Sequence, residues 1–247
     1  MTVSLLQLSD PHLLANPSGW YRGVQPLVNF KRGLQMALSQ IPRPPDLLLL
    51  TGDLCQDESW AGYGMLRDVL EAFALPTALL AGNHDHPQLL RCCLARTAQV
   101  APALISLGEW NLLILDSHWP GAVDGWVSQS QLQWATTALS KKKPALCKHK
   151  NPLIVAVHHP PEDQREGDAL LTALADLAPL KIVLMGHIHQ HRRNLWAETV
   201  LLGCPSSLIQ FNPTQMCPLG LPHQCGGRFL ELEGDGSWRE TLLRWPN

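Results

Sequence analysis

Short apolar runs recur along the chain, and each run stops at a cluster of polar residues. Their length and composition are typical of strands that are buried on both faces of a sheet. The pattern therefore predicts a strand at every run. The runs are Val3–Leu8, Leu47–Leu50, Thr77–Ala81, Leu112–Leu115, Leu153–Val157 and Lys181–Met185.

Between these runs, apolar residues recur at steps of three and four, which is the spacing of one helix face. Leu27, Phe30 and Leu34 begin one such series. Trp60 and Trp134 lie on two of the other apolar faces, so we expect both in the core. The predicted helices span about 26–39, 60–73, 132–139 and 170–177.

Strand and helix alternate up to about residue 185, which predicts an α/β sheet with helices packed outside it. The pattern then changes to segments that resemble antiparallel strands, with a turn at Gly234-Asp235-Gly236. No repeat or linker divides the chain, so we expect one domain over residues 1–247. The late strands are predicted at Arg193–Leu202, Gly227–Leu232 and Trp238–Trp245.

The composition is that of a globular protein: 45% of the residues are apolar and 16% are charged. The net charge of −2 does not indicate a nucleic-acid-binding protein. The one basic run, Lys141–Lys150, is interpreted as a solvated loop. We find neither a signal peptide nor an apolar stretch of the ~18 residues that a membrane span needs, and we expect a cytoplasmic protein without membrane contact.

The seven cysteines form no disulfide framework, which fits a reducing compartment. Cys204, Cys217, His223 and Cys225 lie in one part of the sequence, but no Cys-x-x-Cys pair is present. We therefore interpret them as buried or incidental thiols rather than as a zinc site.

Five of these polar clusters supply candidate ligands, and ligands of open α/β sheets bind beyond the carboxyl ends of strands. The candidate residues are all Asp, Asn or His, which offer oxygen or imidazole nitrogen to a metal ion. Any one cluster alone is typical of a turn, but five in this order predict a shared metal site. Its residues are Asp10, His12, Asp53, Asn83, His84, His158, His187 and His189.

These blocks resemble the signature of the calcineurin-like metallophosphoesterase superfamily. They are Asp10-x-His12, Gly52-Asp53, Gly82-Asn83-His84-Asp85, His158-His159 and Gly186-His187-x-His189. Three further stretches are similar to the bacterial class III 3′,5′-cyclic-AMP phosphodiesterases. These stretches are Gly52–Asp57, Gly125–Ser128 leading to Trp134, and Pro205–Ser207 leading to Pro213.

The resemblance implies a four-layer α/β/β/α sandwich with two metal ions at one edge. One ion would be held by Asp10, His12, Asp53 and His189, and the other by Asp53, Asn83, His158 and His187. The resemblance also makes His84, facing the scissile phosphate, and the bridging Asp53 the expected catalytic residues. It gives no role to His86, His159 or His191, and we interpret His191 as a surface residue.

Two cations ~3.5 to 4 Å apart can clamp the attacking and the leaving oxygen of an in-line displacement. A bridging hydroxide is then the expected nucleophile, and His84 stabilises charge or protonates the leaving oxygen. Asp85 or another nearby carboxylate is expected to orient His84. Mixed imidazole and carboxylate ligands suit iron, manganese, zinc, cobalt or nickel. The resemblance favours iron or manganese.

The expected activity is hydrolysis of a small anionic phosphodiester, with 3′,5′-cAMP first. The alternatives are hydrolysis of 2′,3′-cyclic nucleotides, of UDP-lipid pyrophosphates or of phosphoproteins, and a non-catalytic interaction scaffold. Base selectivity is expected from residues 16–24 or 205–213. Residues 213–226 could form a lid, a dimer contact or a loop, and the resemblance implies a homodimer.

Overall fold

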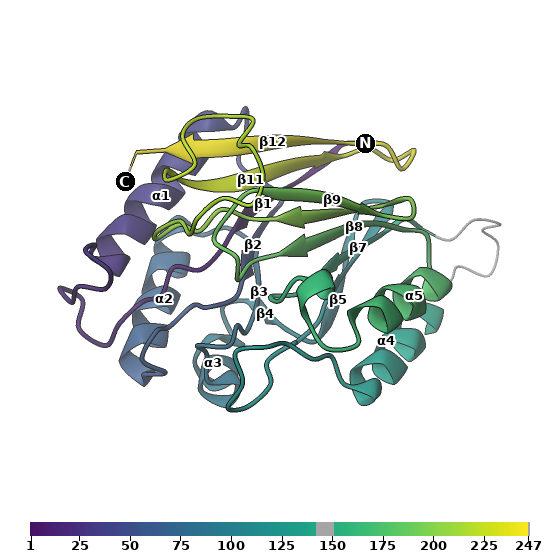
Figure 1. Cartoon of the computed structure of the whole chain (residues 1–247), viewed down its shortest axis with the longest axis horizontal. Helices are drawn as coiled ribbons and strands as arrows, with labels where there is room; N and C mark the ends of the chain where they lie inside the picture. The colour runs from purple at the N-terminus through teal and green to yellow at the C-terminus, as the bar shows by residue number, and fades with distance from the viewer. Residues whose placement is uncertain (142–150, 247) are drawn as a thin grey trace.

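The computed structural model describes residues 1–141 and 151–246, and these residues form two six-stranded sheets with helices outside them (Figure 1). The basic run Lys141–Lys150 lies outside the described residues except for Lys141, so its interpretation as a loop stays a prediction. The two-sheet arrangement confirms the expected α/β sandwich.

The first sheet has the order β12-β11-β1-β2-β3-β4. Strands β1 to β4 are parallel, whereas β11 runs antiparallel to β1, and β12 antiparallel to β11. The carboxyl ends of β1, β2 and β3 therefore lie at one edge of the sheet. The strands are β1 (Val3–Leu8), β2 (Leu47–Thr51), β3 (Thr77–Leu80), β4 (Gln99–Val100), β11 (Cys225–Leu232) and β12 (Trp238–Trp245).

The second sheet has the order β5-β6-β7-β8-β10-β9. Its four central strands are parallel, and the edge strands β5 and β9 are antiparallel to their neighbours. The strands are β5 (Ala103–Leu107), β6 (Trp110–Ile114), β7 (Leu153–Ala156), β8 (Leu180–Met185), β9 (Arg192–Trp196) and β10 (Thr199–Gly203).

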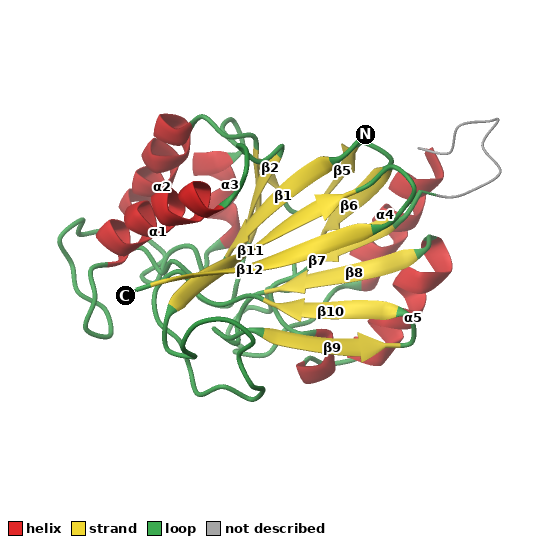
Figure 2. Cartoon of the chain, turned by 90° about the horizontal axis from the view of Figure 1, so that it is seen from above, coloured by secondary structure: helices red, strands yellow, loops and turns green. Residues whose placement is uncertain are grey.

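Helices cover the outer faces of both sheets, with α1, α2 and α3 on one side and α4 and α5 on the other (Figure 2). Ser59 caps α2 by accepting a hydrogen bond from the Gly62 N–H. Pro26 begins α1, where its missing N–H costs no hydrogen bond within the helix. The helices are α1 (Pro26–Gln40), α2 (Trp60–Phe73), α3 (Pro87–Leu94), α4 (Gln129–Lys141) and α5 (Gly167–Leu177), and a 3₁₀ turn, η1, spans Pro161–Asp163.

Three apolar cores separate the four layers. Leu6 and Leu48 contribute to the core between the first sheet and its helices, whereas their neighbours Leu5 and Leu49 contribute to the core between the sheets. A third core, with Val155, lies beneath α4 and α5. Because successive side chains of a strand point to opposite faces, both faces of these strands are mostly apolar, with Ser4 and Gln7 as buried polar exceptions in β1.

Several details differ from the sequence-based expectations. The single strand predicted over 193–202 is a hairpin, because Ala197 turns the chain with a φ of 50° between β9 and β10. Strand β10 is also parallel to β8 rather than antiparallel. Helix α3 and strands β4 and β5 were not predicted; α3 is too short, at 8 residues, to give a clear period.

Trp60 was wrongly predicted to be in the core: it begins α2 and is 54% exposed, while Tyr63 and Leu66 face the sheet. Trp134 is likewise exposed, at 36%. His191 was wrongly predicted to be a surface residue, since it is buried against the guanidinium of Arg228. In the described part of the chain, no helix has the length and apolar content needed to cross a membrane.

Candidate metal centre

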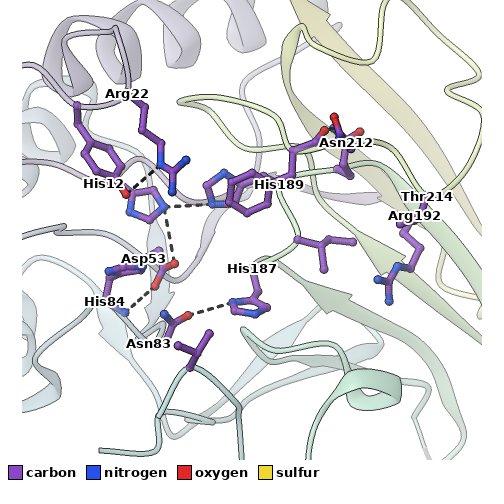
Figure 3. Close-up of a pocket in the computed structure, with 15 residues that line it drawn as sticks. His12, Arg22, Asp53, Asn83, His84, His187, His189, Arg192, Asn212 and Thr214 are labelled. Carbon is purple, nitrogen blue, oxygen red and sulfur yellow. Dashed lines mark hydrogen bonds and ion pairs between the residues drawn. The ribbon is translucent and has the colours of Figure 1, made fainter. Parts of the chain in front are cut away.

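The ends of five strands meet at one edge of the two sheets. Strands β1, β2 and β3 belong to the first sheet, while β7 and β8 belong to the second. Candidate ligands follow two or three positions after the end of each strand, and several of these side chains point into one cavity (Figure 3). The residues in order along the chain are Asp10, His12, Asp53, Asn83, His84, His158, His187 and His189.

Five of these residues have the left-handed backbone conformation, which costs a non-glycine residue on the order of 1 kcal/mol. Such strain persists only where the surrounding structure holds it, and it concentrates at functional sites. The chain turns sharply behind each strand and directs consecutive polar groups inward. The five φ angles are 54° at Asp10, 47° at His12, 49° at Asp53, 66° at His187 and 49° at His189.

The first cluster consists of Asp10, His12, Asp53 and His189, all of them buried, and their ligand atoms lie within 4.8 Å of one another. The Nε2 atoms of His12 and His189 are 3.1 Å apart. His12 Nδ1 is 2.7 Å from the Gln56 side-chain oxygen, and His189 Nδ1 is 3.0 Å from the backbone oxygen of Ile209.

An oxygen of that kind only accepts, so both Nδ1 atoms carry a proton. The two Nε2 atoms face each other beside two carboxylates, and one oxygen of Asp10 has no hydrogen-bond partner. A cation placed between these atoms would satisfy all of them. The donor set therefore fits a metal ion.

The ionisation states also suit a metal ion. Burial lowers the pKa of His12 to about 4, so its imidazole is neutral at pH 7, as a ligand must be. Burial alone raises the pKa of Asp53, but the charge and hydrogen bond of His158 outweigh that effect and hold it well below its usual range. Asp53 is therefore a carboxylate at neutral pH.

The second cluster lies on the other side of Asp53. His158 Nε2 is 3.3 Å from the side-chain oxygen of Asn83, and His187 Nδ1 is 3.0 Å from the same atom. His158 Nδ1 donates to the backbone oxygen of Thr51 at 2.7 Å. Burial alone lowers the pKa of His158, but the Asp53 carboxylate raises it to about 9. A metal ion at Nε2 would replace that proton.

Asp53 joins the two clusters. Its Oδ2 is 3.7 Å from His12 Nε2, whereas its Oδ1 is 3.4 Å from His158 Nε2. One carboxylate thus presents one oxygen to each group of histidines, which is the arrangement of a bridging ligand.

His159, which had no role in the sequence-based prediction, lies beside the second cluster. Its ring is near enough to those of His158 and His187 for the three to form a possible metal-binding group. Its Nδ1 is 2.8 Å from the Ser117 hydroxyl, and its buried Nε2 has no hydrogen-bond partner. Burial lowers the pKa of His159 to about 2, so the ring is neutral.

His84 is oriented by Gln56, not by Asp85 as expected from the sequence. The Gln56 amide nitrogen lies 3.1 Å from His84 Nδ1. Asp85 is buried and accepts hydrogen bonds from the backbone N–H groups of Gly82, Leu54 and Cys55 and from a tyrosine hydroxyl. These bonds hold the loops behind β2 and β3 together, so Asp85 supports the site from beneath.

Gln56 therefore contacts His12 with its oxygen and His84 with its nitrogen. Gln56 lies in the stretch Gly52–Asp57 of the sequence analysis, which predicted no role for it. Its position three residues after Asp53 was the available signal, but its two partners are 44 and 28 residues away in the chain. Only the folded structure identifies them.

The cavity at the centre has a volume of about 410 Å³. Tyr21 and Arg22 line it from one loop, and Phe211 and Asn212 from another. Phe211 stacks on the ring of His189, with 4.2 Å between centroids, and the Arg22 guanidinium lies 5.7 Å from the Phe211 ring. Both segments from which base selectivity was expected thus contribute to this cavity.

The thiols were interpreted as incidental, and Cys204 and Cys225 are indeed buried. Their sulfur atoms lie close to backbone oxygens of Gln7 and Leu208, respectively. Within residues 1–141 and 151–246, the groups that could hold a metal ion contain only Asp and His.

Known proteins match this chain over its length. The model of the calcineurin-like phosphoesterase family matches residues 3–191. A Synechococcus protein (strain WH7803) named probable cyclic nucleotide phosphodiesterase is 43% identical, with 98% of this chain and 96% of that protein covered. The Escherichia coli K12 3′,5′-cyclic adenosine monophosphate phosphodiesterase CpdA is 32% identical, with 98% and 90% covered.

A solved structure described as a dimetal phosphatase from Danio rerio has the same fold, with a TM-score of 0.66 at 12% identity and 98% and 99% of the two chains covered. The family match spans all five polar blocks and most of both sheets. From this match and the two relatives, the chain belongs to the calcineurin-like phosphoesterase family.

Proposed function

We propose that the protein hydrolyses 3′,5′-cyclic nucleotides, and cAMP in particular, at a binuclear metal centre. The observation that carries this proposal is the position of Asp53 between two groups of metal-ligand side chains. The names of the Synechococcus and Escherichia coli relatives support the cyclic nucleotide as substrate.

The proposed ligands fall into two sets that share Asp53. Asp10, His12, Asp53 and His189 hold one ion, and Asp53, Asn83, His158 and His187 hold the other. When bound, two such ions polarise the phosphoryl group and lower the pKa of a shared water. We assign iron or manganese to the site because mixed imidazole and carboxylate ligands suit these metals.

The charge of the site favours an anionic substrate. Asp10 and Asp53 are the two carboxylates of the proposed ligand sets, and the other ligands are neutral. With two divalent ions, these two carboxylates and the hydroxide expected from the shared water, the site would carry a net charge of about +1, which one phosphodiester anion would neutralise. A phosphodiester is a monoanion, so the match is to a diester more than to a dianionic monoester.

His84 is the proposed proton donor or charge-stabilising group for the reacting phosphate. For His12 to offer Nε2 to a metal, its Nδ1 must carry the proton and Gln56 must present its oxygen there. The Gln56 amide nitrogen then donates to His84 Nδ1, which places the His84 proton on Nε2. We propose that Gln56 in this way sets the tautomers of both histidines.

The nucleoside is proposed to lie in the central cavity. Phe211 is 43% exposed and offers an aromatic face, with Arg22 beside it, for a planar base. Free thiols among the described cysteines are consistent with a cytoplasmic enzyme. A homodimer stays a prediction.

The test is a substrate panel on protein reconstituted with iron or manganese, with metal content measured on each sample. We expect turnover of 3′,5′-cAMP above that of 2′,3′-cAMP, UDP-linked lipids and a phosphopeptide. Full metal content without turnover of any cyclic nucleotide would contradict the proposal and would favour another phosphoesterase or a non-catalytic scaffold.

His84→Ala tests the role of that residue in the same assay. We expect two bound metals and a loss of about 10²- to 10⁴-fold in kcat, because His84 acts on the substrate rather than on a metal. Gln133→Ala, on the exposed face of α4, is a control with the wild-type rate. Loss of a metal in His84→Ala would instead make His84 a ligand.

A further inference from the structure

A second cavity, of about 570 Å³, adjoins the central one. Asn83, His84 and Val123 line both cavities, whereas Asp53 and His187 line only the central one, so the second cavity opens beside the reacting centre. The second cavity continues along the start of α3 and the loop at 118–123. The site therefore has room for substituents on two sides of a phosphate.

A 3′,5′-cyclic nucleotide does not need both cavities. Its two ester oxygens belong to the same ribose, so a single nucleoside extends from the phosphate. A linear phosphodiester carries two separate substituents, which can extend in different directions. Two cavities that share His84 fit such a linear substrate.

The two cavities differ in charge. Arg22 and Arg192 line the central cavity and lie at its opposite ends (Figure 3). Among the described residues that line the second cavity, there is no lysine or arginine, whereas Glu58 and Asp85 are acidic. A further phosphate group would be unfavourable there, so the second cavity suits an uncharged substituent.

Two histidines give the second cavity a hydrogen-bonding pattern. His118 Nδ1 donates to the backbone oxygen of Gly82 at 2.9 Å, and Nε2 of the neutral tautomer is then an acceptor. His86 Nδ1 accepts from the backbone N–H of Leu89 at 3.4 Å, which places the ring proton on Nε2 as a donor. A sugar hydroxyl or a nucleobase edge can pair with such an acceptor and donor.

We propose that the second cavity binds the second substituent of linear phosphodiesters, and that the protein hydrolyses dinucleoside monophosphates. The inference rests on the proposed phosphodiesterase function and extends it to a second class of substrate. In the reaction, a water oxygen bonds to phosphorus and one ester P–O bond breaks. The departing oxygen takes up a proton, so the products are one nucleoside and one nucleoside monophosphate.

The probe is deoxyadenylyl-(3′→5′)-deoxyadenosine, assayed beside 3′,5′-cAMP on metal-loaded protein with chromatographic detection of the products. We expect the wild type to release deoxyadenosine and deoxyadenosine monophosphate. Ala122→Phe and Gln88→Trp place bulk in the second cavity only, since neither residue lines the central one. We expect each to lower the ratio of kcat/KM for the dinucleotide to that for cAMP at least ten-fold.

Gln133→Trp, on the exposed face of α4, is the matched control and should keep the wild-type ratio. Gln88 is exposed on α3, so Gln88→Trp should fold and remain a valid test even if Ala122→Phe fails to fold. Turnover of cAMP without the dinucleotide would overturn the inference and leave the proposed function intact. Dinucleotide turnover with an unchanged ratio in Gln88→Trp would overturn the assigned cavity, and no turnover of either substrate would overturn both proposals.

Discussion

At the scale of single residues, the site depends on which ring nitrogen carries each proton. Gln56 contacts two histidines that belong to different strand ends, and one amide group can satisfy both only in one orientation. The left-handed backbone conformations of Asp10, Asp53 and His187 set the direction in which their side chains leave the chain. Tautomer and backbone together determine which atoms face the cavity.

Gln56→Met removes both hydrogen bonds at nearly constant volume. Residues that orient metal ligands and catalytic groups typically contribute 10- to 100-fold, so we expect a loss of that order in kcat for cAMP. The loss should be much smaller for bis(p-nitrophenyl) phosphate, because p-nitrophenolate leaves without a proton. Gln40→Met, at an exposed glutamine of α1, is the control. An equal loss on both substrates would show that Gln56 acts only by orienting the metal ligand His12, and not through His84.

Asn83→Asp tests the charge of the site. The substitution adds a carboxylate beside His158 and His187 and removes the amide donor of a residue that lines both cavities. A hydrogen bond to a charged group contributes about 1.5 to 3 kcal/mol, so we expect kcat/KM to fall about 10- to 100-fold with both metals bound. Unchanged kinetics at full metal content would contradict this account of the charge.

At the scale of elements, the close approach of the strand ends requires glycines. Gly82 follows β3, and a Cβ there would collide with Asp53 and with the His158 ring. We expect Gly82→Ala to displace the bridging carboxylate, to lower metal content below two ions and to reduce activity more than 100-fold. Elemental analysis and cAMP turnover would measure both effects.

The control for this prediction is Gly64→Ala in α2, where a Cβ meets no atom within 4 Å. Alanine is favoured over glycine within a helix by roughly 0.5–1 kcal/mol, so this variant should be fully active and slightly more stable. Two bound metals in Gly82→Ala would show that Asp53 tolerates the intrusion, contrary to the expectation.

The elements that the sequence predicted are those with a strong period or a long apolar run. Strands β1 and β2 and helix α1 were predicted within a residue or two. The hairpin of β9 and β10 was not, because a left-handed Ala197 gives no sequence signal. Trp60 was wrongly predicted to be buried because it is the first residue of α2, where an apolar side chain can point to solvent although it fits the apolar period of the helix.

The same reasoning explains what could be predicted of the site. The eight polar residues follow strands, and parallel strands bring their carboxyl ends to one edge, so their convergence was foreseeable. The contacts of Gln56 and the environment of Asp85 were not, since they depend on loop conformation. The proximity of His159 to the second cluster likewise depends on how its ring packs against Ser117.

At the scale of the whole molecule, the centre joins the two sheets. Asp10 and Asp53 come from the first sheet, whereas His158 and His187 come from the second. Ions bound between them would therefore link the two halves of the sandwich. The single domain expected over residues 1–247 stays a prediction. Removal of the ions would measure how much they contribute to holding the two sheets together.

We expect metal removal to lower the thermal stability of the whole chain. The ions bind the folded state, and a ligand at 100 times its Kd stabilises a protein by about 2.7 kcal/mol. For a protein of this size, each kcal/mol corresponds to about 2–4 °C in Tm, so chelation should lower Tm by roughly 5–10 °C. Calorimetry with and without a chelator measures the shift.

Asp53→Asn separates this effect from any direct action of the chelator. Without the bridging carboxylate the centre binds its ions weakly, so the variant should show a much smaller shift on chelation. Metal re-addition should restore the Tm of the wild type but not that of Asp53→Asn. If the wild type lost both metals at an unchanged Tm, the ions would contribute only to catalysis, and apolar packing between the sheets would be sufficient to hold the sandwich together.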